Sequence, residues 1–243
     1  MRIPKTVYKY TSLPVAEMII GGQSLKFANP KTFNDPFDCD ISGIFFDLNG
    51  HLDFIVKNEI NQLKELFKPN SLSIGDLEEA YKQSITGKLN NSVITCFSSE
   101  KNNHLLWAHY AVNHTGMCLG FDQTLPKNER FLDIKLEMEG SVSYGYNGKL
   151  NFCANKILGH YRLYFTKLKF WRYEKEIRYI ALGDEGIYHF NKNFLKTITF
   201  GLRVSDYEIG RIIRLCERMK FESLSFFKAR IDGSKIVCDV VNK

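Results

Sequence analysis

The sequence lacks the features that mark several large classes of protein. Its six cysteines never stand as Cys-x-x-Cys, and it contains no Gly-x-Gly-x-x-Gly, Walker-type Gly-Lys-Ser/Thr or Gly-x-Ser-x-Gly motif. No apolar run reaches the roughly 18 residues that a membrane span needs. These absences argue against a Rossmann domain, a P-loop NTPase and an α/β-hydrolase, and they predict no membrane partner.

What remains is the composition of an ordinary globular protein. The 243 residues are 44 % hydrophobic and 25 % charged, and 14 % are aromatic, which favours a β-rich core or stacking surfaces. The cysteines lie mostly among apolar neighbours, and the first residues lead into no apolar run. We therefore expect reduced thiols, no signal peptide and a cytoplasmic protein.

The charge is distributed unevenly along the chain. Residues 1–126 carry 11 Lys/Arg against 13 Asp/Glu (−2), and residues 127–243 carry 22 against 14 (+8), which together give the net charge of +6. A basic half can attract a nucleic acid, a nucleotide or an anionic surface. A mildly basic, solvated surface explains the same numbers equally well.

Hydrophobic periodicity and turn residues predict a single α+β domain over residues 1–243, with flanking helices on a mixed, mostly antiparallel sheet. Two amphipathic helices at about 51–87 are expected to form a helical insertion. The expected strands are Val7–Tyr10, Ser24–Ala28, Ser92–Ser98, Gly116–Asp122, Lys135–Tyr144, Tyr173–Ala181 and Leu195–Phe200, and then a hairpin of Ser223–Lys228 and Lys235–Val240. The other expected helices are Pro14–Ile20, one from Asn102 or Asn103 to Asn113, Leu150–Phe165, and one capped by Ser205 and ending at Met219.

The string Phe33-Asn34-Asp35-Pro36-Phe37-Asp38 is unusual for its turn-forming residues between two phenylalanines. Asn and Asp before Pro favour an Asx-turn followed by extended chain. The loop is either a preformed wall of a ligand pocket or a tight structural corner. We expect Asn34 and Asp35 to line the same cleft as His109 and Glu176.

The helix around Trp107 and Tyr110 carries three of the six histidines: His104, His109 and His114. Residues five apart lie about 140° apart around a helix, so these side chains do not share a face as helical zinc ligands do. The pattern predicts no metal site here. Either the aromatic residues pack in a core, or His109 or Tyr110 faces a cleft.

The segment from Trp171 to Ile180 is the richest in charged and aromatic residues. In a strand, Glu174, Glu176 and Arg178 would share one face. Inside a cleft, the arginine would keep one carboxylate ionised, and such a carboxylate can stabilise an oxocarbenium-like sugar centre. The alternative is a solvated, charged edge strand.

Several short motifs occur in a particular order along the chain. They are Tyr8-Lys9-Tyr10, Phe33-Asn34-Asp35-Pro36-Phe37-Asp38, Cys96-Phe97-Ser98, Leu106-Trp107-Ala108-His109-Tyr110-Ala111, His114-x-Gly116, Gly120-Phe121-Asp122 and Trp171-x-Tyr173-Glu174-x-Glu176-x-Arg178. Together, from about Tyr8 to Arg203, they resemble the bacterial family called domain of unknown function 2971. Members occur among phage-resistance and abortive-infection genes, which implies a role in host defence.

The order of elements also has a remoter resemblance to ADP-ribosyltransferase folds, in the opening strand–helix–strand, in Glu174-x-Glu176 and in the closing strand–helix–strand. This resemblance implies an intracellular enzyme that uses NAD as substrate, with Glu176 stabilising the oxocarbenium and Glu174 orienting the acceptor. The other residues expected to contact NAD are Lys9, Tyr10, Asn34, Asp35, Trp107, His109, Tyr110 and Arg178. Lys9 and Arg178 would contact phosphates, and Trp107 or Tyr110 would stack on a ring.

A non-catalytic module for binding a nucleic acid or a protein is the competing hypothesis, because the basic half and the aromatic residues suit such a partner. A deep pocket with Glu176 at its floor favours catalysis, whereas a flat basic face favours binding.

Overall fold

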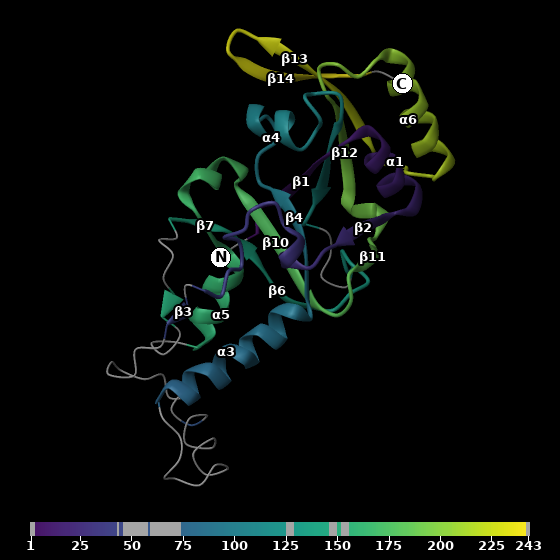
Figure 1. The fold of residues 1–243 in the computed structure, drawn as a ribbon. Helices are drawn as coiled ribbons and strands as arrows, with labels where there is room; N and C mark the ends of the chain where they lie inside the picture. The colour runs from purple at the N-terminus through teal and green to yellow at the C-terminus, as the bar shows by residue number, and fades with distance from the viewer. Residues whose placement is uncertain are drawn as a thin grey trace.

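A computed structural model describes residues 3–42, 44–45, 58, 74–124, 129–145, 150–151 and 156–241. Its centre is an eight-stranded sheet with the order β14-β13-β12-β5-β1-β4-β10-β6 (Figure 1). The strands are β1 (Thr6–Thr11), β4 (Ser92–Ser98), β5 (Met117–Asp122), β6 (Leu136–Ser141), β10 (Glu176–Leu182), β12 (Leu195–Phe200), β13 (Ser225–Asp232) and β14 (Lys235–Val240). All neighbours pair antiparallel except β12 and β13, which confirms the expected mixed, mostly antiparallel α+β class.

Smaller strand pairs and short helices surround this sheet. The pairs are β2 (Ser24–Phe27) with β11 (Gly186–His189), β3 (Ile44–Phe45) with β8 (Leu150–Asn151), and β7 (Ser143–Tyr144) with β9 (Thr166–Lys167). The helices are α1 (Leu13–Gly22), α3 (Ile74–Asn90), α4 (His104–His109), α5 (Lys156–Phe165) and α6 (Asp206–Arg218), with 3-10 turns η1 (Pro30–Thr32), η2 (Lys169–Glu174) and η3 (Lys192–Phe194).

Alternation along the strands divides the core between the two faces of the sheet. On β10, Ile177 and Tyr179 point into the largest apolar cluster, which α1 and α6 cover (Figure 1). Ile180 belongs instead to a cluster with the α5 residues Tyr164 and Phe165. A third cluster gathers under α4, with Tyr10 and Trp107 among its members. The second face is therefore covered by two separate clusters rather than by one.

Local signals explain several element boundaries. Ser205 caps α6 as expected, and together with Glu208 it forms a capping box at the start of the helix. Asn103 caps α4 by accepting from the backbone N–H groups of Leu105 and Leu106. The hairpin of β13 and β14 turns at Gly233, whose φ is 58°, as the Asp-Gly dipeptide predicts.

Other boundaries differ from the expectation. Helix α4 ends at His109 rather than at Asn113, because Val112, Asn113 and His114 all have positive φ and cannot continue a helix. Strand β10 begins at Glu176, since Glu174 closes the turn η2 and Lys175 adopts a left-handed conformation. Helix α5 begins at Lys156, after the short strand β8.

Part of the expected helical insertion is described. Helix α3 covers its second half, and the first helix, expected around residues 52–67, falls outside the described residues. Within the described chain no helix is both long enough and apolar enough to cross a membrane. Cys39, Cys96, Cys118 and Cys238 are free thiols.

Candidate functional site

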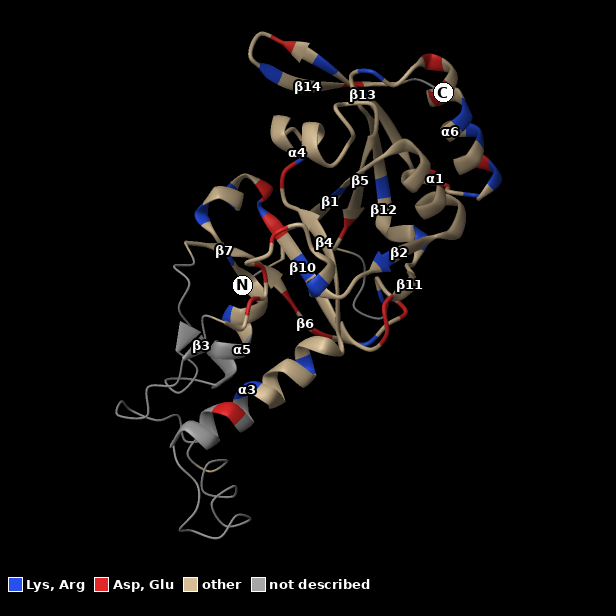
Figure 2. Ribbon diagram, viewed as in Figure 1, with Lys and Arg blue, Asp and Glu red and all other residues tan. Residues whose placement is uncertain are grey.

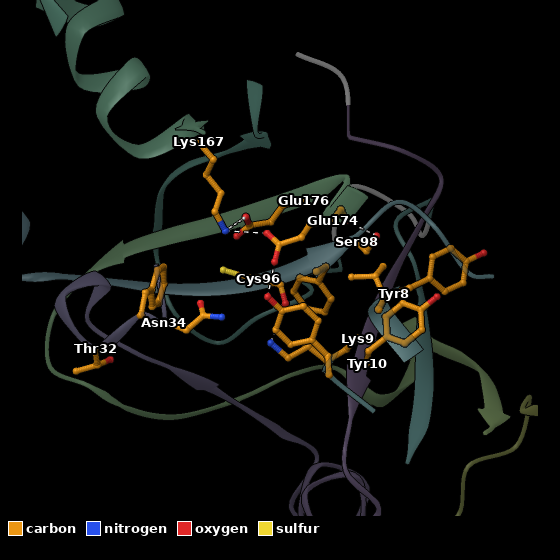
Figure 3. A pocket seen from close by; sticks show the side chains of 14 residues that line it. Tyr8, Lys9, Tyr10, Thr32, Asn34, Cys96, Ser98, Lys167, Glu174 and Glu176 are labelled. Atoms are coloured by element: carbon orange, nitrogen blue, oxygen red, sulfur yellow. Dashed lines mark hydrogen bonds and ion pairs between the residues drawn. The ribbon is translucent and has the colours of Figure 1, made fainter. Parts of the chain in front are cut away.

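A pocket of about 300 Å³ opens where the two smaller clusters leave the sheet uncovered (Figure 3). Its volume lies at the lower end of the range for small-molecule sites, roughly 300–1,000 Å³. Strands β1, β4 and β10 form its floor, and η1, α4, β9 and η2 contribute its walls. The lining residues are Tyr8, Lys9, Tyr10, Thr32, Phe33, Asn34, Cys96, Phe97, Ser98, Leu106, Tyr110, Lys167, Glu174 and Glu176.

Lys167, Glu174 and Glu176 form a charged wall of the pocket. Lys167 lies at its centre, and its amino group points at the two carboxylates (Figure 3). Its Nζ lies 2.7 Å from an oxygen of Glu174 and 3.1 Å from an oxygen of Glu176. A third carboxylate oxygen, from Asp38, lies 3.4 Å away. Burial opposes the charge of Lys167, but these three carboxylates outweigh it and raise the pKa of the ammonium group. Lys167 is therefore held in its charged form.

Arg178 lies behind the pocket. It connects Glu176 on β10, in the pocket floor, with Asp38 in the loop after η1. Its Nε donates to Glu176 at 2.8 Å, and its two terminal nitrogens donate to both carboxylate oxygens of Asp38. One of them also donates to the carbonyl of Tyr164. Arg178 is fully buried, so it fixes Glu176 and cannot make the phosphate contact that the resemblance implied. It is the expected charge partner of Glu176.

The two glutamates of the pocket differ in their electrostatic surroundings. Burial by itself would raise the pKa of Glu176, but Arg178 and Lys167 outweigh it and lower that pKa to about 2. For Glu174, burial and the neighbouring charge of Glu176 raise the pKa, and Lys167 offsets this only in part. The surroundings thus favour the ionised form of Glu176, whereas they drive the pKa of Glu174 in the opposite direction.

Two tyrosines and an asparagine complete the wall opposite Lys167. The hydroxyl of Tyr110 donates a short hydrogen bond to Glu174, and Asn34 lines the same pocket. Tyr10 also lines the pocket, and its hydroxyl donates to the carbonyl of Glu100 at 2.9 Å. Aromatic faces of this kind suit a planar ring or a sugar.

Lys9 contributes a second cation from strand β1. Its Nζ donates to the carbonyl of Cys96 at 2.7 Å and lies 3.5 Å from the hydroxyl of Thr95. Burial lowers its pKa, and no carboxylate in the described part of the chain forms an ion pair with it. An ammonium group without a counter-ion at a pocket wall favours an anionic ligand.

Six of the ten site residues expected from the sequence line this one pocket: Lys9, Tyr10, Asn34, Tyr110, Glu174 and Glu176. Of the four residues expected to share one cleft, Asn34 and Glu176 line this pocket, whereas Asp35 and His109 do not. Glu174 and Glu176 lie on different elements rather than on one strand face, yet Lys167 brings their carboxylates together. The solvated edge strand is wrong, because β10 lies between β4 and β6 and both glutamates are buried.

The other four lie outside the pocket. Trp107 is fully buried against Tyr10, with ring centroids 5.1 Å apart, so it cannot stack on a ligand. His109 is exposed and faces Tyr173 instead. Asp35 is buried, and its Oδ1 accepts from the backbone of Phe37, which is the expected Asx-turn. The fourth residue is Arg178, placed behind the floor as described above.

Sequence reasoning missed Lys167 and Asp38. Lys167 precedes the Trp171 segment in a run of alternating basic and aromatic residues, which gives no local sign that one lysine is buried. Asp38 belongs to the unusual loop, but its partner Arg178 lies 140 residues away. Because Arg178 was already expected to pair with Glu176, no local signal pointed to a second acidic partner.

No group of three or more His, Cys, Asp or Glu side chains among the described residues is arranged to hold a metal ion. A family model described as "Protein of unknown function (DUF2971)" matches residues 106–179. That stretch contains α4, η2 and the first part of β10, and with them Tyr110, Lys167, Glu174 and Glu176. Neither a curated protein nor a solved structure matches the chain.

Proposed function

We propose that the pocket binds the nicotinamide–ribose end of NAD and that the protein is an ADP-ribosyltransferase. The observation that carries this proposal is the pair formed by Glu174 and Glu176, which share Lys167 while their pKa values are driven in opposite directions. Two carboxyl groups separated in this way can divide one reaction between charge stabilisation and proton transfer.

In this reaction the bond between the nicotinamide nitrogen and C1′ of the ribose breaks, and its electron pair leaves with nicotinamide. Positive charge develops at C1′, where the ionised Glu176 would stabilise it. An oxygen or nitrogen of the acceptor then bonds to C1′, and its proton passes to Glu174, whose raised pKa suits a general base. Tyr110 would hold the Glu174 carboxylate in place through its hydrogen bond.

The size and charge of the cavity fit one half of the dinucleotide. About 300 Å³ can hold a nicotinamide and its ribose, and Tyr10 and Tyr110 line that space. The diphosphate would then lie near Lys9, the lining cation without a carboxylate partner among the described residues. The adenosine would lie outside the cavity.

The test measures, by chromatography, the nicotinamide that the purified protein releases from NAD. Wild-type protein should release nicotinamide, and Glu174→Gln and Glu176→Gln should lower the rate by about 100-fold or more. Glu100→Gln is the matched control, because Glu100 is an exposed carboxylate on the loop after β4. If the wild-type protein releases no nicotinamide and modifies no protein, DNA or RNA in a lysate, the enzymatic proposal fails.

A non-catalytic binding module is the second candidate, and one observation favours it. The charges of Lys167, Arg178, Glu176 and Asp38 satisfy one another, as the parts of a purely structural network would. The same experiment separates the two, since a structural network predicts no turnover of NAD. The family resemblance supports a setting in phage defence, where an active transferase would arrest the growth of cells that express it and the Glu174→Gln variant would not.

A further inference from the structure

The turn η2 and the residue after it, Lys169–Lys175, contribute Glu174 to the lining of the pocket, and we name this segment the η2 rim. Lys169, Arg172 and Lys175 are exposed, whereas Glu174, the acid within this segment, points into the pocket and is buried. No ion pair to these three cations occurs among the described residues. The rim thus carries three exposed positive charges without an ion-pair partner among the described residues, on the chain that leads into β10, where Figure 2 colours basic segments blue.

Aromatic rings alternate with these charges. Phe170 is 86 % exposed, which is the largest value among the exposed large hydrophobic residues. The rings of Trp171 and Tyr173 have centroids 6.1 Å apart, and the exposed ring of His109 on α4 follows at 6.0 Å from Tyr173. Lys167 lies 5.0 Å from the centroid of Trp171, which joins this row of rings to the charged wall of the pocket.

We infer that the η2 rim and His109 bind a single-stranded nucleic acid. Rows of aromatic rings bind successive bases by stacking, and interleaved cations follow the phosphate backbone. An acidic polypeptide would use the three cations but would give no role to an exposed phenylalanine and a row of rings. A duplex hides the faces of its bases, so the rings favour a single strand.

This placement would also give the bound nucleic-acid strand a role in the reaction at the pocket. A hydroxyl or amine of a base or sugar that reaches past the rim would arrive next to Glu174, the expected proton acceptor. The strand would then be the acceptor of the ADP-ribosyl group, a role that rests on the proposed function. The binding of this nucleic-acid strand does not rest on the proposed function, because binding is measured without NAD.

Binding is tested by the fluorescence anisotropy of a labelled, mixed-sequence DNA strand of about 16 nucleotides, with the matching duplex for comparison. Wild-type protein should bind the single strand more tightly than the duplex. Replacing Phe170 and His109 by Ala should raise Kd roughly 5- to 100-fold per lost stacking contact. Lys169→Gln combined with Arg172→Gln should weaken binding and flatten the plot of log K against log salt by about 1.4, or about 0.7 per lost contact.

Matched controls lie far along the chain from the rim. Tyr207→Ala removes a ring that is 74 % exposed on α6, and Lys235→Gln removes an exposed charge on β14. Neither should change Kd. Glu174→Gln should bind the strand as the wild type does, and the rim variants should release nicotinamide at the wild-type rate when no nucleic acid is present.

Three results would overturn the inference: no binding of the single strand by wild-type protein, rim variants that bind as the wild type does, or equal competition by polyglutamate of the same charge. If the rim variants lose the DNA while no variant or wild type turns over NAD, the rim binds nucleic acid and the proposed function fails alone. If NAD is turned over and DNA is not bound, the inference fails and the proposed function stands.

Discussion

At the scale of single residues, the glutamates of the pocket should respond differently to the same substitution. Glu176 accepts hydrogen bonds from two buried cations, so Glu176→Gln breaks a buried ion pair and should cost about 3–5 kcal/mol of unfolding free energy. Glu174 has one cation and one tyrosine as partners, and Glu174→Gln should cost about 1–3 kcal/mol. Urea unfolding of both variants beside Glu100→Gln measures the difference.

The larger cost at Glu176 makes Glu174→Gln the cleaner probe of chemistry. Should both variants lose equal stability, the buried cations do not distinguish the two carboxylates, and the assignment of separate roles to them loses its basis.

The hydroxyl of Tyr110 sets how readily Glu174 loses its proton. Because that hydrogen bond favours the ionised carboxylate, Tyr110→Phe should raise the pKa of Glu174 further. A general base must be ionised, so the acidic limb of the profile of kcat/KM against pH should move to higher pH. Nicotinamide release measured across pH 5 to 9 gives that profile, an interval of about four units around neutrality.

Tyr8→Phe serves as the control for this shift. Tyr8 lines the same pocket, and no hydrogen bond from its hydroxyl to Glu174 occurs in the described structure. A limb that moves equally in both variants would show that the change comes from the shape of the pocket rather than from the hydrogen bond.

At the scale of elements, the turn between α4 and β5 depends on the absence of a side chain at Gly116. A Cβ there would lie 2.1 Å from the carbonyl oxygen of Thr11 on β1, which is closer than any real contact. Gly116→Ala should therefore push β1 and β5 apart and destabilise the protein by about 1–3 kcal/mol. Thermal unfolding compares it with Gly87→Ala, in α3, where a Cβ meets nothing within 4 Å.

The control has an expected sign of its own. Replacing an exposed helical glycine with alanine should stabilise α3 by about 0.5–1 kcal/mol, since alanine loses less backbone freedom on folding. Equal destabilisation by both substitutions would contradict the close approach of Gly116 to β1.

Elements whose signal is local were predictable from the sequence. The capping residues Asn103 and Ser205 and the Asp232-Gly233 turn act on their own neighbours, and strand Leu195–Phe200 has the predicted limits. The end of α4 was not predictable, because three consecutive positive φ values carry no glycine to announce them.

The distinction between local signals and long-range contacts also applies to the site. Glu174, Glu176 and Arg178 stand together in the sequence, so their chemistry could be predicted from one segment. Asp38 and Lys167 join them only through strand pairing and loop packing between distant parts of the chain. A basic residue in a run of basic residues gives no sign of burial, which is why Lys167 was not predicted as a site residue.

At the scale of the whole molecule, the pocket exists because the second face of the sheet is covered incompletely. One cluster under α4 and another under α5 leave β1, β4 and β10 open between them. Loops and turns from four parts of the chain close around that gap, and the charged side chains there are held by one another. The site is thereby coupled to the stability of the fold.

This coupling predicts how stability depends on pH. Glu176 has a pKa of about 2 in the folded protein, below its ordinary value near 4.5, so its ionised form is favoured by folding. That contribution is fully present above about pH 4.5 and is lost as the pH falls toward about 2, and its upper limit is roughly 3 kcal/mol. Glu174 acts in the opposite direction: because its pKa is raised, its contribution is present at low pH and is lost as the pH rises.

Urea unfolding of the wild type and of both Gln variants from about pH 2 to 7 separates the contributions of Glu176 and Glu174 to the free energy of unfolding. The free energy of unfolding of the wild type should fall steeply below about pH 4.5, and Glu176→Gln should flatten that fall. Glu174→Gln should leave the fall in place and should remove a loss of stability as the pH rises above about 4.5. A Glu176→Gln variant as sensitive to acid as the wild type would mean that other carboxylates govern acid unfolding and that the network around Lys167 does not link the site to the fold.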